Sequence, residues 1–106
     1  MKKVPKTATP NNLNVVMVGC FDTKGEDFEC LYACLVKYGV QVTTMNVGVL
    51  GTTDRFPVTI QAETVALAAG LKLSEVKAKN DRGAALEIMG NGAANILSEF
   101  YSRKIK

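Results

Sequence analysis

The residues best suited to chemistry stand in one short polar corner that follows an apolar run. Gly19 ends the run, and Asp22, Thr23, Lys24 and Gly25 come just before a helical pattern. Free N–H groups at a helix start, the threonine hydroxyl and the lysine ammonium group are donors that suit a phosphate or another anion. A plain capped helix whose Asp and Lys face water has the same spacing. The sequence contains neither GxGxxG nor GxxxxGK[ST], so no standard nucleotide motif supports the first interpretation.

Two later turns have similar chemistry. Gly48 and Gly51 follow a second strand-like segment, where glycine lets a ligand approach the backbone. Arg82 stands between Asp81 and Gly83 at the head of a long helical pattern, and an arginine there can bind a phosphate or carboxylate through two hydrogen bonds. An ordinary turn and an ordinary helix cap are the alternatives.

Metal chemistry has less support in the sequence. Asp22 paired with Asp81 or Asp54 would offer carboxylate ligands to Mg²⁺, but the sequence does not place these residues within reach of one another. The chain has no His, which removes the commonest metal ligand and general base.

The chain has three cysteines, Cys20, Cys30 and Cys34. A zinc site would want more ligands at tighter pair spacing. We therefore expect free thiols, packed as small apolar groups, in a reducing cytoplasm.

The corner needs a strand before it and a helix after it. Residues 13–19 are almost continuously apolar, which is typical of a strand buried on both faces in a parallel sheet. Apolar residues then recur at helical spacing from Glu26, and Gly39 marks the expected helix end. Thr23 with Glu26 has the spacing of a capping box, so Thr23 is the expected N-cap, with Asp22 as its competitor.

Residues 40–47 are β-branched and partly alternating, which predicts a second strand. The interval between the strands fits a right-handed crossover and therefore predicts parallel pairing. The turn at Gly48 then lies at the same carboxyl edge as Asp22, where open α/β sheets bind ligands.

The second half of the chain reads as helical. Thr59 opens a helix that ends at Gly70, and Ser74 offers a cap for a brief helix after it. Asp81 is the expected N-cap of a final helix over residues 84–101, whose small residues at 90–94 predict close packing on the sheet or on a second subunit. Two clear strands make a poor independent sheet. We therefore expect further strands from a partner or from the rest of a longer protein.

Composition and charge exclude several classes. Of the 13 basic residues, six stand near the chain ends, at positions 2, 3, 6, 103, 104 and 106, which leaves seven basic against ten acidic residues between them. This balance argues against a nucleic-acid-binding face. No apolar run is long enough to span a membrane, and the N-terminus does not resemble a secretory signal. We expect a cytoplasmic protein with a flexible lead-in at residues 1–12 and a single domain at residues 13–106.

The three turns together resemble a known family. The segments VGCFDTKGEDFECL, MNVGVLGT and NDRGAALEIMGNGAANIL are similar to the N-terminal part of the Tm-1-like ATP-binding proteins, also catalogued as the UPF0261 family. The resemblance runs from about residue 15 to residue 101. It implies a Rossmann-like α/β domain that binds ATP or a related nucleotide. Matched position by position, it assigns the site to Gly19, Asp22, Thr23, Lys24, Gly25, Gly48, Gly51, Asp81, Arg82 and Gly83.

The chain also departs from the family pattern. Cys20 and Phe21 replace the usual small residues, and Asn46 stands where the family often has Asp. Family members continue into a strand and a Gly-rich loop, which implies that this chain is an incomplete domain with a half-built nucleotide site. Its expected partners are a nucleotide, a second copy of the chain, or the C-terminal part of the parent protein. The leading hypothesis is nucleotide binding; the alternative is an assembly module without its own ligand, and an enzyme ranks last.

Overall fold

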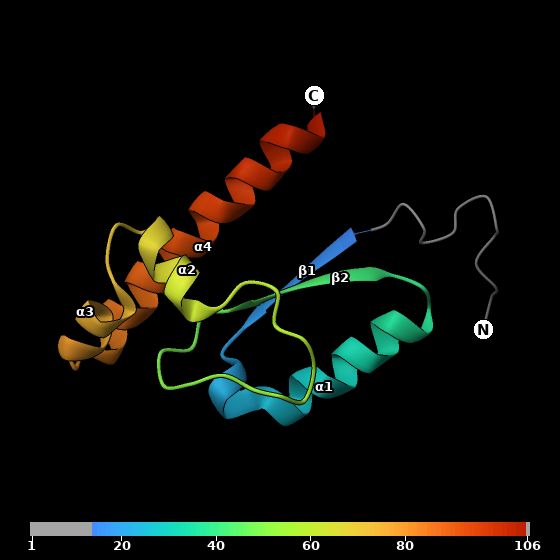
Figure 1. The fold of residues 1–106 in the computed structure, drawn as a ribbon, viewed down its shortest axis with the longest axis horizontal. Helices are drawn as coiled ribbons and strands as arrows, with labels where there is room; N and C mark the ends of the chain where they lie inside the picture. The colour runs from blue at the N-terminus through green and yellow to red at the C-terminus, as the bar shows by residue number, and fades with distance from the viewer. Residues whose placement is uncertain (1–13, 106) are drawn as a thin grey trace.

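The computed structural model describes residues 14–105, so the lead-in predicted for residues 1–12 lies outside the described part of the chain. The described elements are arranged as a small sheet with helices on both sides (Figure 1). In chain order they are β1 (Asn14–Gly19), α1 (Phe21–Lys37), β2 (Gln41–Asn46), α2 (Ala62–Ala68), α3 (Leu73–Ala78) and α4 (Arg82–Ile105). The predicted α/β class, with a parallel sheet and flanking helices, is confirmed.

The sheet has two strands, which run parallel in register from Asn14↔Gln41 to Gly19↔Asn46. An isolated parallel bridge joins Met45 to Ile60, and Ile60 N–H donates to the Thr44 carbonyl oxygen at 2.8 Å. The parallel pairing predicted from the crossover is therefore confirmed. As a consequence, both strands end at the same edge.

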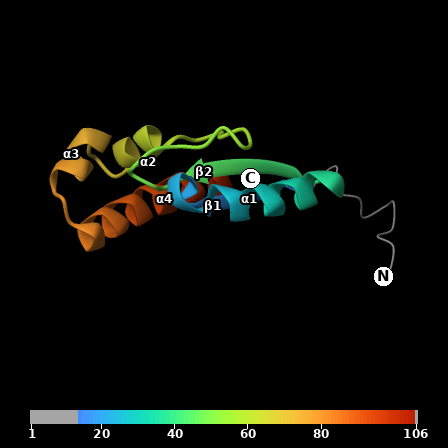
Figure 2. The same cartoon turned by 90° about the horizontal axis from the view of Figure 1, so that it is seen from below.

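The alternation of side chains along the strands divides the core into two clusters. Met17 of β1 packs with Phe21 and Phe56 on the side of α1. Met45 of β2 belongs to the other cluster, whose remaining buried members come from the last three helices. Figure 2 shows α1 running alongside the strands, with the α2–α3 pair to their left. Each strand thus has an apolar contact on both faces, as the continuous apolar run over residues 13–19 predicted.

The predicted start of α1 is wrong. The helix begins at Phe21, Cys20 is its N-cap, and within the described residues no side chain caps it. Phe21 is 1% exposed and its N–H donates to Asn46 Oδ1, which draws the first turn toward the sheet ahead of Thr23. Lys24 then departs from helical geometry, with φ −119° and ψ 26°, so a kink separates this first turn from the rest of the helix.

The predicted start of α2 at Thr59 is also wrong. Thr59 N–H donates to Thr44 Oγ1 at 2.7 Å, so Thr59 belongs to the loop beside β2, and α2 begins only after Gln61. Ser74 does not cap α3, because α3 begins at Leu73 and its Lys72 N–H donates to Glu75 Oε1 at 2.7 Å.

Other predicted helix ends are confirmed. Gly39 follows α1 with φ +80°, and Gly70 follows α2 with φ +91°, a region that glycine adopts without steric cost. Asp81 caps α4, because Ala84 N–H donates to Asp81 Oδ1 at 3.1 Å. α4 extends beyond the predicted residues 84–101 at both ends.

Candidate functional site

The corner after β1 is held by a residue that the sequence analysis did not single out as functional. Asn46 is fully buried at the end of β2. Its Oδ1 accepts hydrogen bonds from Phe21 N–H at 3.2 Å and Gly48 N–H at 2.9 Å, and its Nδ2 donates to the Gly51 carbonyl oxygen at 2.8 Å. One side chain therefore connects the start of α1 with two points near the beginning of the loop after β2. An amide at the last position of a largely apolar and β-branched strand was the sequence signal for it.

Asp22 also connects the start of α1 with the loop after β2. Its Oδ2 accepts a hydrogen bond from Leu50 N–H at 2.9 Å, while its Oδ1 is buried and has no hydrogen-bond partner among the described residues. A Cβ atom at Gly48 would overlap the Asp22 carboxylate, with its closest contact to Oδ1. Glycine at position 48 thus makes room for Asp22, which is a physical reason that the turn pattern alone did not reveal.

A groove of about 590 Å³ lies between this corner and the helices that follow. Four segments form it: the start of α1, the loop after β2, the end of α3 and the head of α4. Its lining residues are Cys20, Asp22, Thr23, Val47, Gly48, Val49, Leu50, Val76, Lys77, Asn80, Asp81, Arg82, Ala85 and Leu86. We call this feature the groove.

The groove combines charged groups of both signs with an apolar wall. Asp22 and Asp81 are its acidic residues, and Lys77 and Arg82 are its basic residues. Leu50 and Leu86 in the wall are 74% and 55% exposed, so the groove presents apolar surface to solvent. The groove therefore suits a ligand that has both an apolar surface and a charged group.

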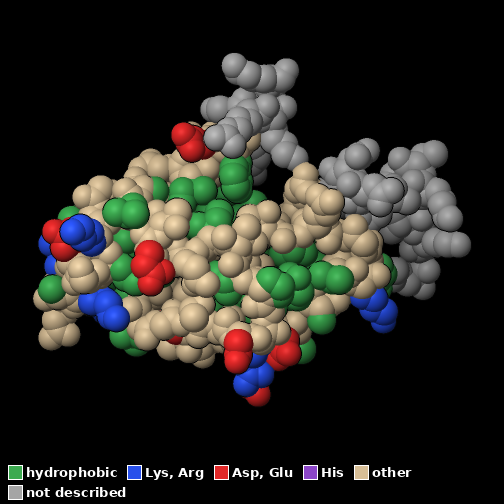
Figure 3. Space-filling view, in the orientation of Figure 1, with side chains coloured by type: hydrophobic (Ala, Val, Ile, Leu, Met, Phe, Trp, Pro, Cys, Tyr) green, Lys and Arg blue, Asp and Glu red, His purple; other side chains and the backbone are tan. Residues whose placement is uncertain are grey.

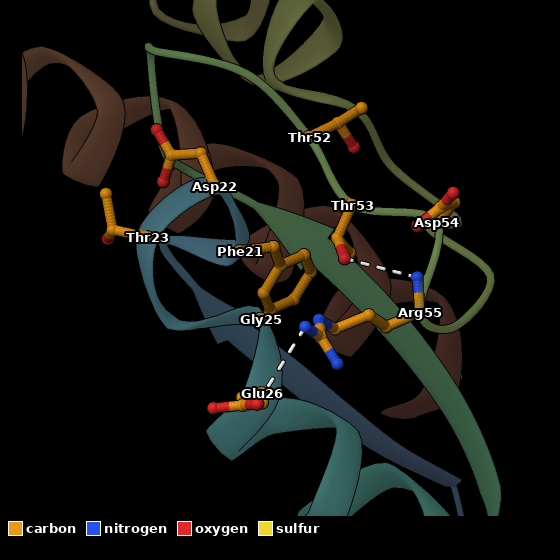
Figure 4. A pocket seen from close by; sticks show the side chains of 9 residues that line it. All are labelled: Phe21, Asp22, Thr23, Gly25, Glu26, Thr52, Thr53, Asp54 and Arg55. Atoms are coloured by element: carbon orange, nitrogen blue, oxygen red, sulfur yellow. Dashed lines mark hydrogen bonds and ion pairs between the residues drawn. The ribbon is translucent and has the colours of Figure 1, made fainter.

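A second pocket of about 670 Å³ lies on the other side of the corner. Figure 4 shows its residues: Phe21, Asp22, Thr23, Gly25, Glu26, Thr52, Thr53, Asp54 and Arg55. Arg55 Nη1 donates to Glu29 Oε1 at 3.0 Å, and Arg55 Nη2 lies 3.9 Å from Glu26 Oε2. We call this feature the Arg55 pocket.

The structure brings together five of the ten site residues predicted from the sequence. Asp22, Thr23, Gly48, Asp81 and Arg82 line the groove. The three predicted turns therefore meet at one groove: parallel pairing brings the first two together, and the packing of α3 and α4 brings the third.

The other predicted residues lie elsewhere. Gly25 lines the Arg55 pocket, while Gly19, Lys24, Gly51 and Gly83 line neither feature. Gly19 has a packing role, because a Cβ atom there would overlap the Phe28 ring. Lys24 is exposed.

Several lining residues were missed by the sequence analysis. Lys77 comes from the end of α3, Asn80 from the turn that follows it, and Leu86 from the first turns of α4. Asn80 has φ +49°, the left-handed conformation that turns the chain from α3 into α4. No motif marks these positions, because only the packing of α3 beside the head of α4 brings them to the groove.

The remaining candidate chemistry is sparse. Among residues 14–105 there is no cluster of three or more Cys, Asp or Glu side chains able to hold a metal ion.

The three cysteines are free, as predicted, but Cys30 and Cys34 are exposed, so the prediction that they pack as apolar groups is wrong. On α1, the partly buried Phe28 and Tyr32 pack against the core, whereas the two thiols are exposed to solvent.

Charged side chains are few over the middle of the face drawn in Figure 3. On the face drawn in Figure 3, charged side chains lie mostly at the rim, and hydrophobic patches show between them. Within the described part of the chain, no helix is long and apolar enough to cross a membrane.

Comparison with known proteins places the chain in a family. Residues 13–106 match the model described as "Uncharacterised protein family (UPF0261) N-terminal domain". A "UPF0261 protein" of Clostridium tetani (strain Massachusetts / E88) is 34% identical over 86 residues, which is 81% of this chain and 21% of that protein. The chain thus spans about a fifth of the length of the curated relative it matches, and no solved structure matches it. Because the family model covers nearly all of the sequence, the chain belongs to the UPF0261 family, as its N-terminal domain.

Proposed function

We propose that the groove binds a nucleotide, ATP or a close relative. The observation that carries the proposal is the meeting of the Asp22 corner, the Gly48 loop and the head of α4 around one groove. This is the carboxyl edge of a parallel sheet, where α/β domains bind their ligands. The resemblance to Tm-1-like proteins supports ATP as the nucleotide.

In this proposal the phosphates of the nucleotide bind at the head of α4. The first intrahelical backbone bond there runs from Ala85 N–H to the Asp81 carbonyl oxygen at 2.9 Å, so the N–H groups of Arg82 and Gly83 precede it. The positive end of the helix dipole and the Arg82 and Lys77 side chains add charge that suits an anion. The start of α1 is less available, because Asn46 already occupies Phe21 N–H.

In this proposal the base of the nucleotide packs against the apolar wall of the groove. Val49 and Leu50 come from the loop, and Leu86 from α4. Leu50 is 74% exposed and Leu86 is 55% exposed, so a planar ring between them would remove apolar surface from water. Ligand sites commonly pair such a wall with a few polar groups that set orientation.

Mg²⁺ fits this proposal as a companion of the phosphates. Magnesium sites on nucleotides commonly use one or two carboxylates, with phosphate oxygens and water completing the shell. Asp22 and Asp81 are the two carboxylates that the groove offers.

The test is the affinity of the full chain for ATP, measured by calorimetry with and without Mg²⁺. Arg82→Ala removes a charge-assisted phosphate contact and is expected to weaken ATP binding by about tenfold or more. Lys37→Ala removes the same charge from the last turn of α1, outside both cavities, and is expected to leave the affinity unchanged. Equal affinities of wild type and Arg82→Ala, or no ATP binding, would refute the proposal.

A second candidate function is assembly, as a module that docks on another subunit or on the rest of the parent protein. The specific observation is β1: it pairs only with β2, so within residues 14–105 its other edge has no partner strand. Val18 on this strand is 37% exposed. Open edges that carry apolar side chains favour pairing with another chain.

A further inference from the structure

The groove and the Arg55 pocket are adjacent parts of one surface. Asp22 and Thr23 line both of them. The loop after β2 also contributes to both, with its first residues, through Leu50, in the groove and Thr52–Arg55 in the pocket. The hydrogen bond from Leu50 N–H to Asp22 Oδ2 lies between the two cavities and closes the direct path from one to the other. A ligand that occupies both must therefore cross their shared wall on the outside, over the exposed Thr23.

The two cavities differ in their chemistry. The Arg55 pocket is lined by three threonines, three carboxylates and one guanidinium, and by few apolar groups. Arg55 is its basic side chain, and it is already hydrogen-bonded to Glu29. An excess of carboxylates repels phosphate, whereas carboxylate oxygens readily accept hydrogen bonds from neutral hydroxyl groups.

Two threonines in the pocket are set for complementary hydrogen bonding. Thr52 Oγ1 donates to Gln61 Oε1 at 3.0 Å, so its lone pairs stay available to accept. Thr53 Oγ1 accepts from Arg55 N–H at 3.2 Å, so its own hydrogen stays available to donate. Figure 4 shows both side chains on the loop opposite the first turns of α1. A sugar hydroxyl both donates and accepts, and can use such a pair.

We propose that the groove and the Arg55 pocket form one extended site for a nucleotide whose terminal phosphate carries a sugar. The inference rests on the proposed nucleotide binding in the groove and adds the polyhydroxylated group as the occupant of the pocket. Asp22 and Thr23 stand at the junction of the two parts, and Thr52, Thr53 and Asp54 line the part that we assign to the sugar.

The experiment compares the affinities of the full chain for ADP and ADP-glucose by calorimetry. Wild type is expected to bind ADP-glucose about tenfold more tightly than ADP, since hydrogen bonds to charged groups contribute that much. Asp54→Ala is expected to abolish most of this advantage and to leave ADP binding unchanged. Thr52→Val, which removes a hydroxyl without changing charge, is expected to reduce the advantage too.

Asp27→Ala is the matched control, because Asp27 is an exposed carboxylate of α1 that lines neither cavity. It is expected to keep the full preference for ADP-glucose. Equal affinities for ADP and ADP-glucose, or a preference that survives in Asp54→Ala, overturn the extended site and leave the groove proposal standing. Failure of the chain to bind ADP, ATP and ADP-glucose alike overturns both.

Discussion

At the scale of single residues, the geometry of the site depends on the hydrogen bonds that Asn46 and Asp22 make. Asn46 makes three hydrogen bonds that connect α1 with the loop after β2. Asp22 makes one such connection through Leu50 and keeps its second oxygen buried beside Gly48. Buried polar groups cost free energy when they lose their partners, so these contacts set the geometry of the corner.

Asn46→Ala tests this arrangement. It leaves Phe21 N–H and Gly48 N–H without their acceptor, and each buried unsatisfied group costs about 1 to 3 kcal/mol. We expect a loss of about 3 kcal/mol in the free energy of unfolding, measured by urea denaturation. Thr64→Ala, at an exposed position of α2, is the control for a neutral substitution. A loss in Asn46→Ala no larger than in the control would mean that Asn46 does not hold the corner.

The contact between Gly48 and Asp22 can be tested by a double-mutant cycle. Gly48→Ala places a Cβ atom on the Asp22 carboxylate and is expected to destabilise the protein by about 1 to 3 kcal/mol. In an Asp22→Ala background the obstructing oxygens are gone, so the same substitution should cost much less. Identical costs in the two backgrounds, measured by denaturant unfolding, would contradict this explanation of Gly48.

At the scale of elements, α2 and α4 pack closely against each other. A Cβ atom at Gly92 would overlap the backbone carbonyl oxygen of Val65, and backbone cannot swing aside as a flexible side chain does. Gly90, two residues earlier on α4, has no atom within 4 Å of the same position and is exposed. The final helix was predicted to pack closely on the sheet or on a second subunit, but within the described residues its close approach at Gly92 is to α2.

These two glycines form a matched pair for mutagenesis. Gly92→Ala is expected to lower the free energy of unfolding by about 2 kcal/mol or more, because the two helices must separate. Gly90→Ala is expected to raise it by up to about 1 kcal/mol, because alanine favours the helix and meets nothing. Thermal and denaturant unfolding measure both. Effects of the same sign and size would show that Gly92 is not a packing contact.

At the scale of the whole molecule, a two-stranded sheet leaves one edge of β1 open within the described residues. Small two-stranded sheets are marginal alone, and additional strands or helices stabilise them. The apolar clusters on both faces support the sheet here, but they do not cover its edge. Assembly of the molecule with another chain through this open edge is the second candidate function.

Sedimentation velocity over a range of concentrations tests assembly. If β1 is a docking edge, the sedimentation coefficient rises with concentration, and Val18→Lys suppresses the rise because edge lysines oppose strand pairing. Leu67→Lys makes the same kind of change at an exposed apolar position of α2 and should leave the rise intact. A single monomeric species at all concentrations would contradict assembly by a second copy.

The sequence by itself determined the α/β class, the parallel strand pair and several helix ends, because these depend on local periodicity, glycine conformation and the handedness of crossovers. Tertiary structure decided where α1 begins, since burial of Phe21 and its bond to Asn46 outweighed the capping pattern at Thr23. It also decided that Lys77 and Leu86 border the groove and that Lys24 does not. Those positions follow from how distant elements pack, and a single chain's residue order contains no local signal for such contacts.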